Sequence, residues 1–386
     1  MVCLLLEKAC KGTLFYLSAQ INLHFLSQNR WILYDVSHAE PPFCLGFAGC
    51  LHRYFIGTSS VLHRYFAERM LRVCRGFLYI LPIPSNKNLD GSTIFCTFAR
   101  LMKSRPRLAH RMTMNVVDAL YRIGTWITHS ATAWNTAGES IHSPYLFEWV
   151  RMVMYDSHAY YAWAQIEKRR EAMLRAPKLI DYVDFGSGAN QGTSRKRMVS
   201  DIAKTDLEPR LYGELLFRLV NWLGHQVREE EGRDLNIIEL GTSLGITAAY
   251  LAMADSRNHV LTFDGCPAVM DMARFNWTKL GIRNITGVVG DIDNTLALHL
   301  SDTVDIAFID ANHTKEAALR YFDAIAAHVS CKSVVILDDI YHNRDMHTAW
   351  QTVCERQDVT STMDLWKMGL VFFDPDYLHK NYKLRI

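Results

Sequence analysis

Acidic residues end a series of candidate strands in the second half of the chain. Four apolar segments carry them: HVLTFD ends in Asp264, ITGVVGD in Asp291, VDIAFID in Asp310, and SVVILDD in Asp338 and Asp339. Helical segments alternate with these strands, which predicts βαβ units and a parallel sheet covered by helices on both faces. Ligands bind outside the carboxyl ends of such strands. The acids therefore indicate a binding edge.

A glycine turn lies just before this series, in the segment NIIELGTSLGIT. Thr242 and Ser243 stand where the dinucleotide fingerprint needs its middle glycine. Hydroxyls and backbone N–H groups at a helix N-terminus suit a carboxylate, Glu239 would lie near an ammonium or sulfonium, and Asp264 could accept both ribose hydroxyls. An amino-acid tail with a ribose describes S-adenosylmethionine (SAM) better than NAD; NAD and a sheet without a ligand are the alternatives. We expect cofactor contacts from Glu239, Gly241, Thr242, Ser243, Gly245, Thr247, Asp264, Asp291 and Asp310, with Asp291 near the adenine.

A second glycine-rich turn occurs earlier, in VDFGSGANQGTSRK, Val183 to Lys196. The fifty residues after it offer helices but no further strand that ends in an acid, so the later turn is predicted to hold the ligand. The earlier turn is either a simple connection or a flap that closes over the reaction centre. In the second case Arg195, Lys196 and Arg197 would reach an anionic part of the substrate.

The first 110 residues differ in composition from the rest of the 386-residue chain. They hold 13 Lys and Arg against 5 Asp and Glu, and six of the nine cysteines, whereas the whole chain has a net charge of +2. The cysteine spacing fits neither a zinc site nor a disulfide framework. The apolar start is broken by Glu7 and Lys8, so we expect a poor signal peptide and no membrane span there. We predict that residues 1–111 are a non-native or poorly ordered extension and that the protein proper starts at Met112 or Met114; a lineage-specific extension and a functional arm are the alternatives.

Helical periodicity begins at Met114 and continues through an aromatic-rich segment to about residue 174. After the early glycine turn, the sequence to about residue 227 predicts two more helices. We therefore expect a helical cap or lid with a glycine-rich flap over 112–210, followed by the binding domain over 211–386. The overall charge balance predicts neither a nucleic-acid partner nor an acidic tail.

The motifs ELGTSLGIT, FDGCP, GDIDNTL, FIDANH and LDDIYHN occur in this order and resemble a class I SAM-dependent methyltransferase. Within that class they are similar to O-methyltransferases related to catechol and caffeoyl-CoA methyltransferases, and most of all to a bacterial branch common in Bacteroidetes. The resemblance runs from about Met114 to the end of the chain. It implies an α/β fold with a Rossmann-like sheet of seven strands, whose last strand is antiparallel and closes a hairpin formed by DVTSTMDL and KMGLVFFD.

The resemblance also implies a site for the chemistry. Metal-dependent members hold Mg²⁺ with acids at positions that match Asp310, Asp338 and Asp339, and use a Lys base where this chain has His313. Three carboxylates with waters would suit Mg²⁺ or Ca²⁺, and a histidine could take a proton near neutral pH. We expect His313, His342 and Asp310 to be catalytic. The alternative is that these acids cap helices or orient the cofactor.

Two classes of function follow from these expectations. The first is a cytoplasmic methyltransferase that acts on a small-molecule acceptor, with a hydroxyl oxygen as the expected target and a homodimer as one allowed assembly. The second is a SAM-binding scaffold or sensor without transfer activity. The two histidines and the acid cluster favour the enzyme.

Overall fold

The computed structural model describes residues 118, 121–133, 141, 143–183, 194–300, 303–376 and 379–386. These residues belong to a unit that spans Met112–Ile386. Two predictions lie outside the described residues: the extension over 1–111 and the flap formed by the GSGANQG segment.

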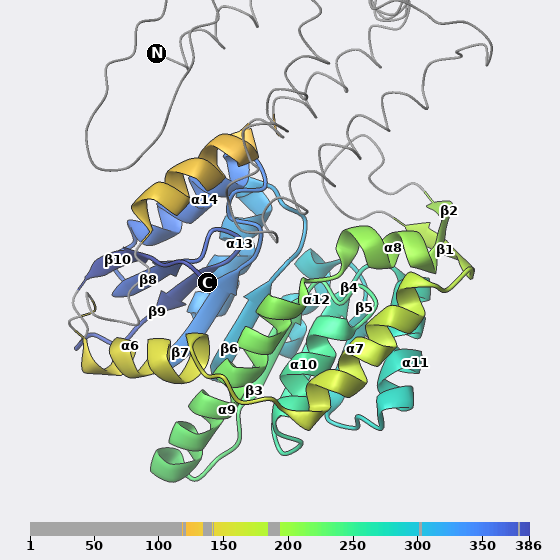
Figure 1. The fold of residues 1–386 in the computed structure, drawn as a ribbon, viewed down its shortest axis with the longest axis horizontal. Helices are drawn as coiled ribbons and strands as arrows, with labels where there is room; N and C mark the ends of the chain where they lie inside the picture. The colour runs from red at the N-terminus through yellow and green to blue at the C-terminus, as the bar shows by residue number, and fades with distance from the viewer. Residues whose placement is uncertain are drawn as a thin grey trace, which may run out of the picture. The chain divides into compact units, whose positions relative to one another are not determined.

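One eight-stranded sheet organises the described part of the chain, in the order β10-β8-β9-β7-β6-β3-β4-β5 (Figure 1). Neighbours from β5 to β7 pair in parallel, and β9 is antiparallel to both β7 and β8. The predicted Rossmann-like α/β sheet with its antiparallel closing strand is therefore confirmed. An eighth strand, β10, pairs in parallel with β8 beyond the seven that were expected. The strands are β3 (Asn236–Leu240), β4 (His259–Asp264), β5 (Ile285–Val289), β6 (Val304–Ile309), β7 (Val329–Leu337), β8 (Ser361–Asp364), β9 (Gly369–Phe372) and β10 (Lys380–Lys383).

The two faces of the sheet are covered by different helices. Alternate residues point to opposite faces of a strand, so Ile306 packs with one group of helices and Ala307 with the other. The first group contains α6 (Pro144–Trp149), the π-helical turn η2 (Val150–Met154), α9 (Arg210–Glu231) and α10 (Ile246–Ala254). The second contains α12 (Ile292–His299), α13 (Lys315–Ala326) and α14 (Arg344–Cys354). Figure 1 shows α6 and α14 on opposite sides of the strands β8 and β9.

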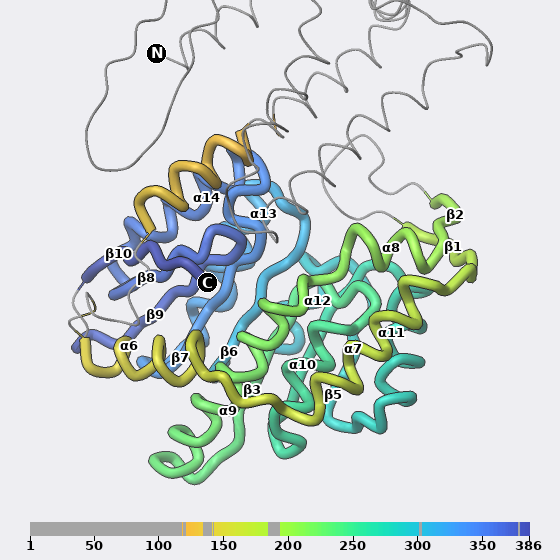
Figure 2. The backbone as a smooth tube through the Cα atoms, viewed as in Figure 1, coloured from red at the N-terminus to blue at the C-terminus, as the bar shows by residue number. Residues whose placement is uncertain are grey.

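The segment before α9 is only partly the helical cap that its periodicity predicts. Residues 121–132 are helical, and α7 (Tyr161–Leu174) and α8 (Val199–Asp206) follow in the chain. Between α7 and α8 lies an antiparallel hairpin of β1 (Leu179–Val183) and β2 (Ser194–Met198), whose path Figure 2 follows. The first of the two helices that the sequence predicts after the glycine turn starts only at Val199, because residues 194–198 pair with β1 as the strand β2.

The two arginines of β2 contact neighbouring side chains. Arg197 Nη1 lies 3.1 Å from Asp206 Oδ2, and the Arg197 guanidinium stands 4.6 Å from the centre of the Tyr182 ring. The Arg195 guanidinium lies 5.7 Å from the same ring.

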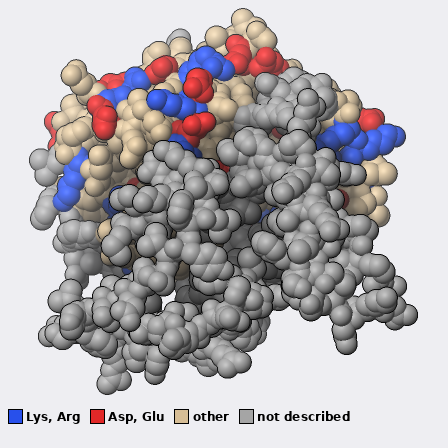
Figure 3. Space-filling model, turned by 90° about the horizontal axis from the view of Figure 1, so that it is seen from above, with Lys and Arg blue, Asp and Glu red and all other residues tan. Residues whose placement is uncertain are grey.

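On the described part of the face in Figure 3, Lys and Arg side chains are interleaved with Asp and Glu. In the residues that the structure describes, no helix is both long and apolar enough to cross a bilayer.

Candidate active site

The turn after β3 approaches the neighbouring strand so closely that it requires glycine. Gly241 has a φ of +103°, and a Cβ added there would overlap the backbone carbonyl oxygen of Asp310. Its N–H and that of Thr242 both donate to the Phe263 carbonyl, at 2.9 and 3.0 Å. Gly245, with a φ of +74°, is the N-cap of α10. The turn thus joins the ends of β3, β4 and β6 at one point of the sheet edge.

Glu239 is a fully buried carboxylate beside this turn. The Thr262 hydroxyl donates to Glu239 Oε2 at 2.5 Å, and the Thr242 and Thr262 hydroxyls lie 2.6 Å apart. Glu239 Oε1 has no hydrogen-bond partner. Burial raises the pKa of Glu239 to about 8. An acid with an unpartnered oxygen in an apolar setting is suited to a positively charged ligand group.

Asp264 ends β4 and is held by the backbone on both of its oxygens. Ser243 N donates to Oδ2 at 2.9 Å, and Cys266 N donates to Oδ1 at 2.8 Å. Burial raises the pKa of Asp264 to about 6. Its orientation is therefore fixed before any ligand binds, and each oxygen keeps lone pairs for a further donor.

Asp291 and Thr247 complete the residues that were predicted to contact a cofactor. The exposed Asp291 is the N-cap of α12, and its side chain accepts a hydrogen bond from Asp293 N. Its contacts in the structure are therefore those of a helix cap. Thr247 lies in the first turn of α10 and is buried. We call Glu239, Gly241–Gly245 and Asp264 the β3–β4 half of the sheet edge.

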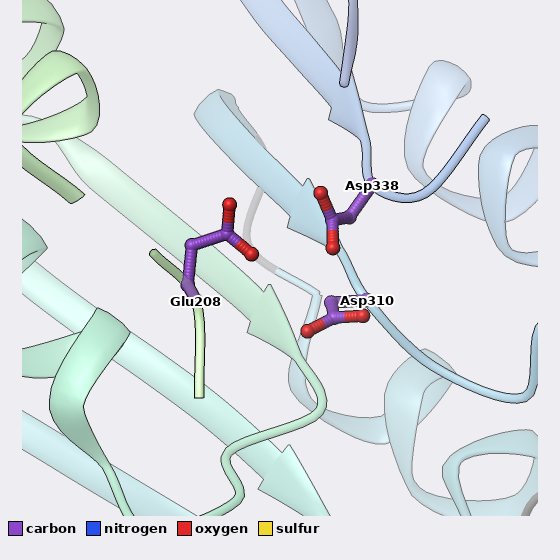
Figure 4. Close-up of side chains that lie close together, drawn as sticks. All are labelled: Glu208, Asp310 and Asp338. Atoms are coloured by element: carbon purple, nitrogen blue, oxygen red, sulfur yellow. The ribbon is translucent and has the colours of Figure 1, made fainter. Parts of the chain in front are cut away.

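The acid cluster lies at the ends of β6 and β7. Ligand atoms of Glu208, Asp310 and Asp338 all lie within 4.8 Å of one another (Figure 4). Asp310 and Asp338 converge as the strand order predicts. The third member is Glu208, from the segment between α8 and α9, and not Asp339. We call Asp310, His313, Asp338, Asp339 and His342 the β6–β7 half.

A lysine bridges these acids. Lys367 lies in the turn between β8 and β9, and its Nζ is 2.5 Å from Asp338 Oδ2, 2.7 Å from Glu208 Oε2 and 3.3 Å from Asp339 Oδ1. The side chains of Glu208 and Asp338 are each 2% exposed, and that of Lys367 is 15% exposed. An ammonium group therefore lies inside a nearly dry group of carboxylates.

The electrostatics of the cluster follow from burial and crowding. Burial and the neighbouring Asp338 raise the pKa of both Glu208 and Asp310 well above the ordinary values. Burial also raises the pKa of Asp338. Burial acts in the same direction on Asp339, but His342 and Lys367 outweigh it and hold the pKa of Asp339 below its usual range. Within this group, Asp339 is thus the acid whose ionised form the surroundings favour.

The two predicted base residues lie against each other. The rings of His313 and His342 are stacked, with centroids 5.1 Å apart and an interplanar angle of 18°. His313 Nε2 lies 3.5 Å from Asp310 Oδ1, and His342 Nδ1 lies 3.4 Å from Asp339 Oδ2. Burial lowers the pKa of His313 to about 4, with smaller contributions from nearby cations. His313 is therefore neutral at pH 7 and able to accept a proton.

Backbone strain is concentrated at this edge of the sheet. Among the described residues, five other than glycine have a positive φ, and all five follow the carboxyl ends of strands. Such conformations cost about 1–3 kcal/mol each and collect at functional sites. They are Ser243 (46°), Asn312 (64°), His313 (30°), Asp339 (50°) and Trp366 (69°).

The donors for the predicted Mg²⁺ are only partly in place. Asp310 and Asp338 converge with Glu208, and one oxygen each of Glu208 and Asp338 lacks a hydrogen-bond partner. However, Lys367 Nζ occupies the position between Glu208 and Asp338 that a bridging cation would take. With the ammonium there, a divalent ion would lie beside a second cation, so the set fits it poorly.

Residues 238–340 match a family model described as a methyltransferase domain. This match confirms the resemblance to methyltransferases, whereas the bacterial branch stays a prediction. No curated protein matches the chain.

Three solved structures illustrate the structural likeness. A Podospora anserina methyltransferase with bound SAH is 16% identical over 60% of this chain and 97% of its own, with a TM-score of 0.40. An O-methyltransferase from Bacillus cereus in complex with SAH is 16% identical over 58% and 96%, with a TM-score of 0.39. A Streptomyces achromogenes O-methyltransferase in complex with SAM is 18% identical over 43% and 81%, with a TM-score of 0.37.

Proposed function

We propose that this protein is a SAM-dependent methyltransferase that transfers a methyl group to a hydroxyl oxygen of a small-molecule acceptor. One observation carries the proposal: the buried Glu239, with an unpartnered oxygen beside the glycine turn, lies at the same sheet edge as the stacked and neutral His313. The first feature suits a cationic cofactor, and the second suits the removal of a proton from an acceptor.

The β3–β4 half would hold the cofactor. Glu239 Oε1 would accept from the ammonium of the methionine moiety, the turn Gly241–Gly245 would present backbone N–H groups to its carboxylate, and Asp264 would accept from the ribose hydroxyls. Thr247 and Asp291 would complete the site, the latter near the adenine. When bound, SAM supplies an electrophilic methyl group on a sulfonium.

The β6–β7 half would bind and activate the acceptor. His313 is neutral at pH 7 and would take the proton of the acceptor hydroxyl. The stacked His342, next to the ionised Asp339, is the second candidate for this role. Asp310 lies 3.5 Å from His313 and would orient the imidazole.

The test uses tritiated SAM and a metabolite extract as the source of acceptors. Labelled product should form with the native protein and fall at least about a hundredfold in His313→Gln if this residue is the base. The same loss in His342→Gln, with His313→Gln active, would assign the base to His342. SAM binding without labelled product from any extract would favour the scaffold or sensor. Crystals soaked with extract and SAH would then identify the acceptor that binds.

A further inference from the structure

Lys367 reaches the acid cluster from a turn that is built to present it. The turn spans Leu365–Met368, and Leu365 N donates to the Met368 carbonyl at 2.9 Å. Asp364 Oδ1 accepts from Trp366 N at 2.8 Å, which fixes the strained residue just before Lys367. The Lys367 carbonyl accepts from Ile340 N at 3.1 Å. The turn is therefore bonded directly to the loop that follows Asp338 and Asp339.

The ammonium contacts three carboxylates. A lysine carries three N–H donors, and three carboxylates, Glu208, Asp338 and Asp339, lie within 3.3 Å of Nζ. Glu208 lies in the segment before α9, whereas Asp338 and Asp339 are neighbours in the loop after β7. The contacts thus tie the segment before α9 to the ends of β7 and β8.

We propose that Lys367 is a built-in counter-cation that takes the place of a divalent metal, so that the acid cluster works without one. This inference rests on the proposed function for its catalytic meaning, but the charge arrangement can be tested alone. Mg²⁺ binds oxygen at about 2.0–2.1 Å and needs near-octahedral geometry. It would share the carboxylates of Glu208 and Asp338 with Nζ, and the two cations would repel each other there.

The acceptor then binds differently from a ligand chelated by a metal. A metal could hold two adjacent oxygens of an acceptor, whereas an ammonium surrounded by three carboxylates does not chelate such a pair. Lys367 is therefore a positioning residue. It orients Asp338 and Asp339, and through Asp339 it acts on His342. The acceptor needs one hydroxyl near His313 and His342, not a pair of adjacent hydroxyls.

The first experiment measures metal binding to the native full-length protein. Mn²⁺ is titrated and followed by electron paramagnetic resonance, with SAM binding measured separately by calorimetry. We expect no saturable Mn²⁺ site at the cluster and full methyl transfer in excess chelator. A saturable Mn²⁺ site that Asp338→Asn abolishes would overturn the proposal, even if every lysine variant failed to fold.

The second experiment removes the ammonium and leaves the acids. Lys367→Met should create a Mn²⁺ site at least about tenfold tighter than any in the native protein, because Glu208, Asp310 and Asp338 lose their counter-charge. Mn²⁺ should raise the Tm of this variant but not that of the native protein. Glu208→Gln in the Lys367→Met background should remove the new site. Lys332→Met is the matched control, since Lys332 pairs with Glu230 and Glu231 outside the cluster, and it should gain no site.

The outcomes separate this inference from the proposed function. Failure to bind SAM would contradict the proposed function and leave the Mn²⁺ result valid. Equal Mn²⁺ binding in the native protein and in Lys367→Met would contradict the counter-cation, whatever the result with SAM. A Lys367→Arg variant should keep the cluster free of metal, because the positive charge is retained.

Discussion

The two halves of the sheet edge differ in the groups that stabilise their buried acids. In the β3–β4 half, Glu239 and Asp264 receive hydrogen bonds from neutral hydroxyl and backbone donors, and Glu239 keeps one oxygen without a partner. In the β6–β7 half, a full positive charge from Lys367 contacts three acids. The first half therefore has room for a cationic group from a ligand. The second half has its own, which leaves it free to receive a neutral acceptor.

The largest expected effect comes from the residue at which the two halves meet. Gly241→Val should abolish SAM binding, because its side chain would overlap the Asp310 carbonyl and its φ of +103° is unfavourable for a β-branched residue. Calorimetry with SAM checks this.

Two controls make the Gly241 result specific. Gly281→Val also places a side chain at a positive φ, but a Cβ there meets nothing within 4 Å, so SAM affinity should be kept. Gly188→Val, in the earlier glycine turn, should change SAM affinity by no more than a few-fold. If Gly188 proves critical and Gly241 does not, the wrong turn has been assigned to the cofactor.

Asp339→Asn should separate the halves. It keeps the shape of the side chain but removes the charge beside His342, so methyl transfer should fall by about a hundredfold or more. SAM binding should stay near that of the native protein, because Asp339 is not in the β3–β4 half. Label transfer and calorimetry measure the two effects. A parallel loss of SAM affinity would show that the halves are not independent.

Glu239→Gln should lower SAM affinity by about tenfold to a hundredfold, as expected for the loss of a hydrogen bond between charged groups. In the free protein the pKa of Glu239 is raised to about 8, so it is mostly protonated at pH 7. A cationic ligand favours the ionised form, and binding should release a proton. SAM affinity should therefore rise with pH up to about 8 and then level off.

Calorimetry in buffers of different ionisation enthalpy measures the proton released. At pH 7 the native protein should release about one proton, and Glu239→Gln should release none from this position. A pH-independent affinity in the native protein would contradict the assignment of Glu239 to the cationic group.

The smallest expected effect comes from removing residues 1–111, which precede both halves in the sequence. A protein that starts at Met112 should fold and bind SAM with unchanged affinity, because the eight described strands of the sheet all lie after it. Expression, circular dichroism and calorimetry test this proposal. An insoluble product, with the full-length chain soluble, would make residues 1–111 part of the fold.

The β3–β4 half could be predicted from the sequence because its contacts are local. Thr242, Asp264 and the glycines belong to one βαβ unit, and strand alternation places them together. In the β6–β7 half the same logic brought Asp310 and Asp338 together but missed Glu208 and Lys367. Both come from segments whose position depends on how a long helix and a hairpin pack on the sheet.

Two short elements were also missed for physical reasons. The sequence of β2, SRKRM, is mostly polar and becomes a strand only because β1 pairs with it. The sequence of β10, KNYK, offers one buried residue, Tyr382. Short polar strands show little alternation of apolar and polar residues. Whether such a segment forms a strand therefore depends on its pairing partner and not on the local sequence.

The eighth strand has a consequence for the behaviour of the protein at high concentration. Without β10, the strand β8 would present a row of unpaired backbone N–H and C=O groups to other chains, and such an edge promotes aggregation. In the described sheet, β10 pairs with β8 from Ser361 to Asp364 and is itself only four residues long. It begins at Lys380 and ends at Lys383, and charged lysines on an edge strand oppose further strand addition. This short strand therefore opposes self-association through the sheet edge that lies away from the β3–β4 half.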